Sequence, residues 1–135
     1  MPAQPPFQHT IHRLSDVTVD VTFIGYMSAD ANEHKKEIEA IFTSSQVPQR
    51  LCFTAGELMG FHRDQLIAYV DLFSRNAKKI AGIAIVKARP VVHFGSITLS
   101  LMTKMPIKNF ESYDEAHRWL SSLPAAKHNA ASAGG

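Results

Sequence analysis

The chain has 135 residues, of which 45% are hydrophobic and 19% are charged, and this composition is typical of a globular domain rather than a disordered chain. The formal net charge is only +2, and the basic residues are too scattered to indicate a nucleic-acid-binding surface. No apolar run is long enough for a transmembrane segment, no apolar signal segment follows Met1, and the single cysteine, Cys52, cannot form a disulfide within the chain. We therefore expect a cytoplasmic protein that neither binds nucleic acid nor crosses a membrane.

One folded domain is predicted over residues 7–123. Residues 1–6 and 124–135 are rich in proline or in small residues, which predicts a flexible tail at each end. The domain is expected to begin with a hairpin of two strands, residues 7–14 and 17–24, because apolar and polar residues alternate in the second of them.

The next part of the chain predicts two helices around a short strand. Gly25 is expected to end the hairpin, and Asp30 with Glu33 forms a capping-box pattern at the start of a helix over residues 30–44. A strand over 50–54, a loop over 55–60 that contains two glycines, and a helix over 62–75 follow.

Residues 80–86, IAGIAIV, form the longest uncharged strand pattern, and near-continuous apolarity predicts a strand buried on both faces. Residues 97–101 alternate like a strand, but a parallel strand after residue 86 needs a crossover, so we predict a helix over 90–103. A strand over 105–110 and a helix that begins at a second capping box, Ser112 to Glu115, complete the order ββαβαβαβα. This order predicts a single α/β domain with a mixed, largely parallel sheet and helices on both faces.

The closing residues, Phe110 to Leu120 (FESYDEAHRWL), carry a family resemblance. The pattern F-x-x-x-[DE]-E-A-x-x-W-L after an apolar strand resembles the end of SpoIIAA-like proteins, STAS-related domains akin to anti-sigma-factor antagonists, and the element order agrees over about residues 10–123. The resemblance implies a non-enzymatic domain, without a cofactor, that docks on proteins or holds a small apolar ligand.

The resemblance does not extend to the phosphorylation switch of that family. In phosphorylatable STAS domains a serine stands at the start of the helix that follows the corresponding strand. Here the strand is expected to end at Thr54, and the matching stretch, His62-Arg63-Asp64, has no hydroxyl. A phosphoryl switch needs a hydroxyl at that helix start, so we expect no inherited phosphorylation.

Ligands of open α/β sheets bind beyond the carboxyl ends of the strands, and this rule selects two groups of residues. We predict a partner-binding surface formed by Gly56, Glu57, Met59, Gly60, Phe61, His62 and Arg63. A possible ligand or anion site comprises Thr54, Lys87, Arg89 and His93. The alternative is that the glycines make a turn and the cations are solvated.

No metal site and no catalytic residue are predicted. The histidines lack zinc-site spacing, His9 and His12 point to opposite faces of a strand, and Cys52 is expected in the core. Acid–base chemistry is a third hypothesis, and it requires His62, Lys87, Arg89 and His93 to converge near Glu57 or Asp64.

Two sets of apolar side chains have alternative interpretations. One set forms either core or the lining of a ligand cavity: Met59, Phe61, Tyr69, Phe73, Met102 and Met105. The other set is expected to seal the last helix: Phe110, Tyr113 and Trp119. The favoured function is a regulatory or scaffolding module that binds another protein or a second copy of itself, and the alternative is a carrier or sensor of a small apolar, lipid-like ligand.

Overall fold

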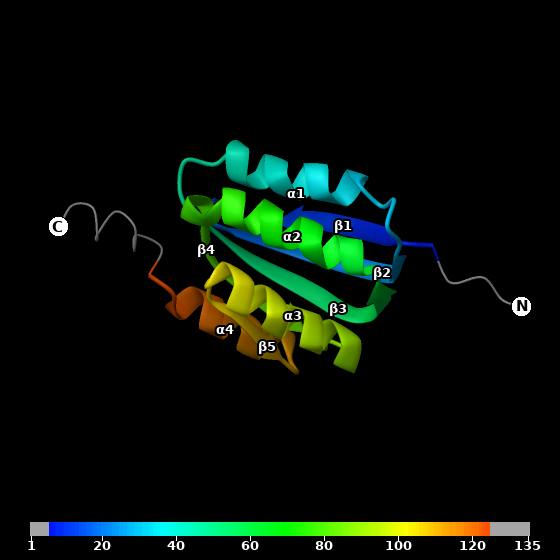
Figure 1. Cartoon of the computed structure of the whole chain (residues 1–135). Coiled ribbons are helices and arrows are strands. Elements are labelled where there is room, and N and C mark those ends of the chain that lie inside the picture. The colour runs from blue at the N-terminus through cyan, green and yellow to red at the C-terminus, as the bar shows by residue number, and fades with distance from the viewer. Residues whose placement is uncertain (1–5, 125–135) are drawn as a thin grey trace, which may run out of the picture.

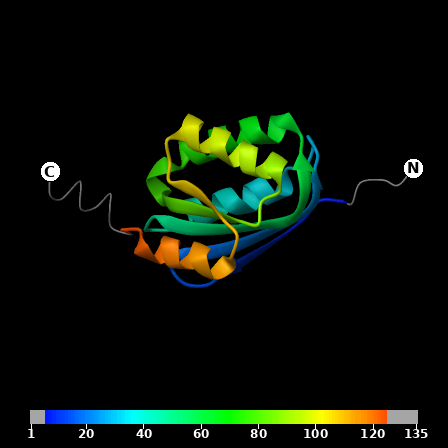
Figure 2. The same cartoon turned by 90° about the horizontal axis from the view of Figure 1, so that it is seen from below.

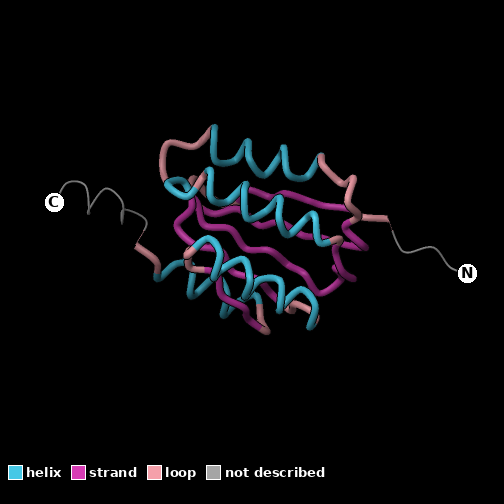
Figure 3. Tube along the Cα trace, viewed as in Figure 1, coloured by secondary structure: helices cyan, strands magenta, loops and turns pink. Residues whose placement is uncertain are grey.

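A computed structural model describes residues 6–124. Its five strands form one sheet in the order β1-β2-β3-β4-β5, in which β1 and β2 are antiparallel and the other neighbours are parallel (Figure 1). Figure 3 shows strands and helices alternating after the opening hairpin. The strands are β1 Gln8–Arg13, β2 Thr18–Met27, β3 Gln49–Phe61, β4 Ile80–Val86 and β5 Ile107–Phe110. The helices are α1 Glu33–Thr43, α2 Arg63–Arg75, η1 Ala77–Lys79, α3 Pro90–Thr103 and α4 Tyr113–Ser122.

The sheet separates two layers of helices. The helices α1, α2 and α3 cover one face, and α4 lies on the other (Figure 2). The larger core cluster joins buried side chains of α1, α2 and α3 to the sheet. A second, smaller cluster joins Ala116 and Leu120 of α4 to Cys52, Ala84 and Val86. The predicted mixed α/β sheet with helices on both faces is therefore confirmed.

The strand β4 has the bounds predicted from its uncharged sequence. It lies between β3 and β5, and alternate side chains enter the two clusters: Ile83 and Ile85 face α1–α3, whereas Ala84 and Val86 face α4. Burial on both faces explains why this strand carries no in/out alternation of polarity.

Two predicted strand ends are wrong. The strand β2 continues through Gly25 to Met27, and β3 continues past Thr54 to Phe61, so the two strands pair as far as Met27 and Phe61. The two strands stay paired because their register shifts before Ile24 and again after Gly25. Gly25 has a φ of 90°, a backbone conformation that favours glycine. The glycines that predicted a loop over residues 55–60 therefore lie inside a strand.

The helix starts give mixed outcomes. The predicted capping box at Asp30 is wrong, because α1 begins after Asn32 without a side-chain cap and Asp30 instead accepts a hydrogen bond from Ser28 Oγ at 2.5 Å. At α4 one of the two hydrogen bonds of the predicted capping box is present, since Ser112 Oγ accepts from the backbone N–H of Glu115 at 3.1 Å. The helix predicted over 90–103 is α3, with Pro90 in its first turn. None of the helices in residues 6–124 is long and apolar enough to cross a membrane.

Candidate functional site

The predicted partner-binding residues lie in the last half of β3 and at the start of α2, rather than in a loop. Glu57 and Met59 have exposed side chains, and Met59 remains 47% exposed. Gly60 is buried beside Tyr26, since a Cβ on Gly60 would lie 3.5 Å from that ring. Only part of the predicted surface is therefore available to a partner.

Phe61 ends β3 and packs under α3. A Cβ on Gly95 would lie 2.6 Å from Cζ of Phe61, so the absence of a side chain at Gly95 lets the ring approach the helix. Phe61 is half-buried against the larger core cluster. Its ring therefore packs between α3 and the sheet and is only partly accessible to a partner.

His62 and Arg63 form the start of α2. Nδ1 of His62 accepts a hydrogen bond from the backbone N–H of Asp64 at 3.1 Å, so the imidazole caps the helix in the way a serine often does. The side chain of Arg63 is exposed. The side chain at the N-cap of this helix is thus an imidazole rather than the hydroxyl of a serine.

The predicted ligand residues adjoin the partner-binding residues. Thr54 pairs with Val86 at the end of β4, and Nε of Arg89 donates to the carbonyl oxygen of Gly56 at 3.3 Å. The side chain of Lys87 runs beside the same glycine, with its Cβ 3.5 Å from the position of a Cβ there. Lys87 and Arg89 are thus brought to β3.

The two histidines required by the acid–base hypothesis are not linked. His62 is bonded to Asp64, and His93 lies exposed in the first turn of α3. Among the hydrogen bonds and ion pairs of residues 6–124, none joins His62 to His93.

An apolar pocket of about 90 Å³ lies between the sheet, α2 and α3. Three of the six residues predicted to line such a cavity do so, namely Phe61, Tyr69 and Phe73. The hydroxyl of Tyr69 is buried without a hydrogen-bond partner, and burial raises the pKa of this phenol well above its usual value. Of the other three predicted residues, Met59 and Met102 are exposed and Met105 is buried elsewhere.

The helix α3 presents apolar side chains to solvent. It contains no Asp, Glu, Lys or Arg. Val92, Gly95, Ser96 and Leu99 are buried, and the larger apolar side chains on the outer side are exposed. We call the outer side the α3 face; it consists of Val91 (49% exposed), Phe94 (72%), Ile97 (44%), Leu101 (73%) and Met102 (64%).

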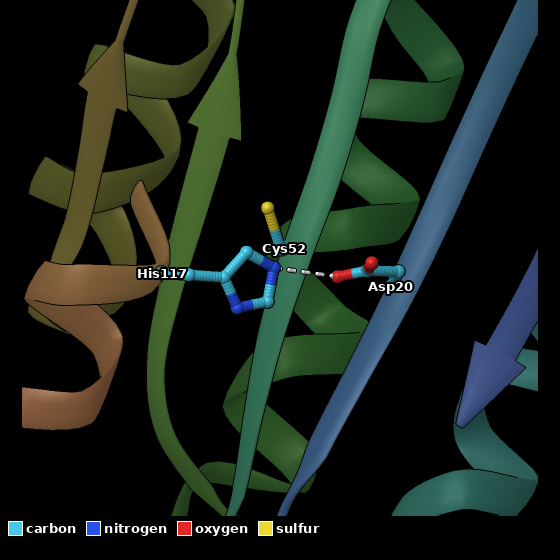
Figure 4. A group of neighbouring side chains, drawn as sticks. All are labelled: Asp20, Cys52 and His117. Carbon is cyan, nitrogen blue, oxygen red and sulfur yellow. Dashed lines mark hydrogen bonds and ion pairs between the residues drawn. The ribbon is translucent and has the colours of Figure 1, made fainter. Parts of the chain in front are cut away.

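The other face of the sheet holds a polar cluster that the sequence did not predict. Asp20 of β2 and His117 of α4 point toward each other, and the side chain of Cys52 of β3 lies beside them (Figure 4). Tyr113, expected to seal the last helix, is 42% exposed and donates its hydroxyl to Asp20 instead. The three elements are far apart in sequence. A prediction that β2 pairs with β3 in this register would have placed Asp20 beside Cys52, but no sequence pattern indicates that His117 joins them.

The fold is that of a small α/β domain, with a mixed five-stranded sheet and one helix, α3, whose exposed face is apolar. The chain belongs to the SpoIIAA-like family, whose model matches residues 18–121. No curated protein matches the sequence.

Two solved structures share the fold. An uncharacterized protein of the DUF3478 family with a SpoIIAA-like fold, from Shewanella loihica PV-4, is similar with a TM-score of 0.66 and 17% identity, over 89% of this chain and 97% of that one. The anti-sigma factor antagonist SpoIIAA in its unphosphorylated form is similar with a TM-score of 0.63 and 15% identity, over 88% of this chain and 99% of that one. At these identities the likeness establishes the fold.

Proposed function

We propose that this protein is a non-enzymatic regulatory or scaffolding module that binds a protein partner through the α3 face. Membership of the SpoIIAA-like family supports a STAS-type regulatory domain. The observation that carries the proposal is that five apolar side chains of one helix lie exposed together. Contiguous apolar surface of this kind marks an interaction site on a soluble domain.

The residues selected from the sequence contribute to one end of this surface. Phe61 packs under Gly95 of α3, and Arg89 is the residue before the helix. We therefore assign the exposed Arg63 and Arg89 to the polar rim beside an apolar centre, which is the usual anatomy of an interface. Because the start of α2 carries His62 rather than a hydroxyl, docking is not switched by phosphorylation there.

A capture experiment with the full chain as bait tests the proposal. Phe94→Asp and Leu101→Asp place a carboxylate at the two most exposed positions of the α3 face, and Leu14→Asp makes the same change at an exposed leucine (44%) before β2. We expect a host protein that is retained by the natural chain and by Leu14→Asp to be lost with both α3 variants. With that partner purified, either α3 variant should weaken binding by a factor of about 30 or more, as at an interface hot spot. Equal retention by all four baits contradicts the proposal.

Self-association is measured in the same series. Sedimentation of the natural chain and of Leu101→Asp distinguishes a second copy from a different protein as the occupant of the α3 face. A dimer that dissociates only in the α3 variants identifies the partner as the chain itself.

The cavity supports a second candidate, a carrier or sensor of a small apolar ligand. Its lining is apolar except for a few groups, among them the unpartnered hydroxyl of Tyr69. At about 90 Å³ it is smaller than the roughly 150 Å³ cavity that binds benzene in an engineered protein. A larger ligand would therefore have to part α2 from α3 and displace Phe61.

Thermal shift and native mass spectrometry test this second candidate. A medium-chain alcohol should raise the melting temperature of the natural chain more than that of Tyr69→Phe. Only the natural chain has a buried hydroxyl at residue 69 that can form a hydrogen bond with the hydroxyl of the ligand. The corresponding alkane should affect both chains equally. A purified chain with only its apo mass and no shift with either ligand rules the candidate out.

A further inference from the structure

The sheet face that carries α4 brings three kinds of metal-binding side chain together. Asp20 and Cys52 are register partners on β2 and β3, and His117 reaches them from the second turn of α4 (Figure 4). Nε2 of His117 lies 2.8 Å from Oδ1 of Asp20. One ligand atom from each of the three residues lies within 4.8 Å of the others.

These distances are close to those of a tetrahedral zinc site. Zinc binds thiolate, imidazole and carboxylate at bond lengths of about 2.0–2.3 Å, which places neighbouring ligand atoms about 3.3–3.8 Å apart. From 2.8 Å the nitrogen and oxygen would separate slightly, and from a separation of at most 4.8 Å the sulfur would approach them by up to about 1 Å. Such changes are within the reach of side-chain rotation and leave the strands and α4 in place.

The charges also balance. A divalent ion, one thiolate, one carboxylate and a neutral imidazole sum to zero, which suits a site where His117 and Asp20 have side chains only 21% and 17% exposed and Cys52 is fully buried. Without an ion, burial and then the charge of Asp20 raise the pKa of the Cys52 thiol to about 12. An ion would replace that proton.

A hydrogen bond from Tyr113 orients the carboxylate of Asp20. The hydroxyl of Tyr113 is bonded to Oδ2 of Asp20, the oxygen that His117 does not use, and its ring lies 4.3 Å from the ring of His117. Ligating carboxylates in metalloproteins are commonly held by such second partners. The first turn of α4, which carries Tyr113, is itself fixed by the Ser112 cap.

We propose that Asp20, Cys52 and His117 form a binding site for a divalent transition-metal ion of the zinc class. The mixed sulfur, nitrogen and oxygen ligand set favours zinc over calcium or magnesium, which prefer oxygen alone. A water molecule would supply the fourth ligand, since the side chains of His117 and Asp20 are partly exposed. The bound ion links β2, β3 and α4.

Cobalt(II) titration of the reduced, chelator-treated full chain tests the site directly. Since Cys52 is the only cysteine, a thiolate-to-cobalt charge-transfer band can arise within the chain only from this residue. We expect the band to saturate at one ion per chain and to disappear when zinc is added. Cobalt binding without the band, or no binding, overturns the proposal whether or not any variant folds.

Variants then test the other ligands. His117→Gln and Asp20→Asn should each weaken zinc binding by a factor of 100 or more, and Tyr113→Phe should weaken it by about 10–100-fold, as loss of an outer partner does. His93→Gln is the matched control, because His93 is an exposed histidine of α3 on the opposite side of the sheet. Zinc should raise the melting temperature of the natural chain and of the control but not of His117→Gln. Unchanged zinc affinity in folded His117→Gln and Asp20→Asn overturns the assignment.

Discussion

Nε2 of His117 lies 2.8 Å from Oδ1 of Asp20, although the two residues are 97 positions apart in the chain. The hydroxyl of Tyr113 binds the second oxygen of the same carboxylate. The apolar contacts of α4 lie with residues of β3, β4 and β5. The hydrogen bonds of His117 and Tyr113 to Asp20 therefore attach α4 to β2 as well.

Replacing Asp20 by alanine should loosen that attachment. His117 and Tyr113 lose a charged acceptor together, and hydrogen bonds to charged groups contribute about 1.5–3 kcal/mol each. Both partners reach water in part, so we expect the free energy of unfolding to fall by only about 1–3 kcal/mol. Urea denaturation in the presence of a chelator measures this without any contribution from a metal ion. Asp16→Ala, at an exposed aspartate in the turn before β2, should change stability by less than about 0.5 kcal/mol, and a fall of the same size there would contradict the role of Asp20.

Elements with strong local signals were predictable from the sequence. The uncharged run of β4, the crossover requirement at α3 and the serine cap of α4 each fix a structure within a few residues. The end of β3 was not predictable in this way, because glycine is common in turns and residues 56 and 60 are both glycines. In the structure both glycines adopt strand conformation beside a large neighbour, the side chain of Lys87 for one and the ring of Tyr26 for the other.

The candidate sites depend on contacts that no local pattern records. The crossover requirement predicts the helix α3, but which of its apolar side chains are exposed depends on which residues pack on Phe61 and the sheet. Asp20, Cys52 and His117 come from a strand, a second strand and the last helix, so a search for zinc spacing within one segment cannot find them.

Gln65 should be essential to the junction between α2 and the segment before α1. Its amide nitrogen donates to the carbonyl oxygens of Ser28 at 2.6 Å and Ala31 at 2.8 Å, and its amide oxygen accepts from Lys35 Nζ at 2.8 Å. Gln65→Leu keeps the volume but removes all three bonds in a place that is 1% exposed. We expect a loss of about 2–3 kcal/mol in urea unfolding. Gln46→Leu, at an exposed glutamine, should leave the midpoint almost unchanged, and equal midpoints for both variants would refute the role of Gln65.

Gly95→Ala tests the contact between α3 and Phe61. Alanine normally stabilises a helix interior by about 1 kcal/mol relative to glycine, but here its Cβ would lie 2.6 Å from Cζ of Phe61. We expect the natural chain to lose about 1 kcal/mol of stability, because the ring must move. In a Phe61→Leu background the same substitution should become stabilising. A double-mutant cycle measures this change of sign, and additive effects would show that the ring does not limit the approach of α3.

His34 should make the fold sensitive to mild acid. The residue is 1% exposed, neither ring nitrogen has a hydrogen-bond partner, and the ring lies 4.8 Å from that of Phe7 and 5.7 Å from that of Tyr69. Burial, followed by the charges of Lys35 and His9, lowers the pKa of His34 from 6.5 to about 4. Between these two pH values the unfolded chain therefore binds a proton that the folded chain does not, and stability falls as the pH falls.

The expected size of this effect follows from the width of that interval. Each pKa unit corresponds to about 1.4 kcal/mol, so His34 should account for a loss of about 2–3 kcal/mol between pH 7.5 and pH 4.5. His34→Phe keeps an aromatic ring in the same apolar surroundings and removes the titrating group, so its unfolding free energy should change less over this range. Carboxylates and the other histidines, including the partly buried His9 with its partner Glu37, are present in both chains, and their contributions cancel in the comparison to first order. Parallel curves of unfolding free energy against pH for the two chains would show that His34 binds its proton equally well in the folded state.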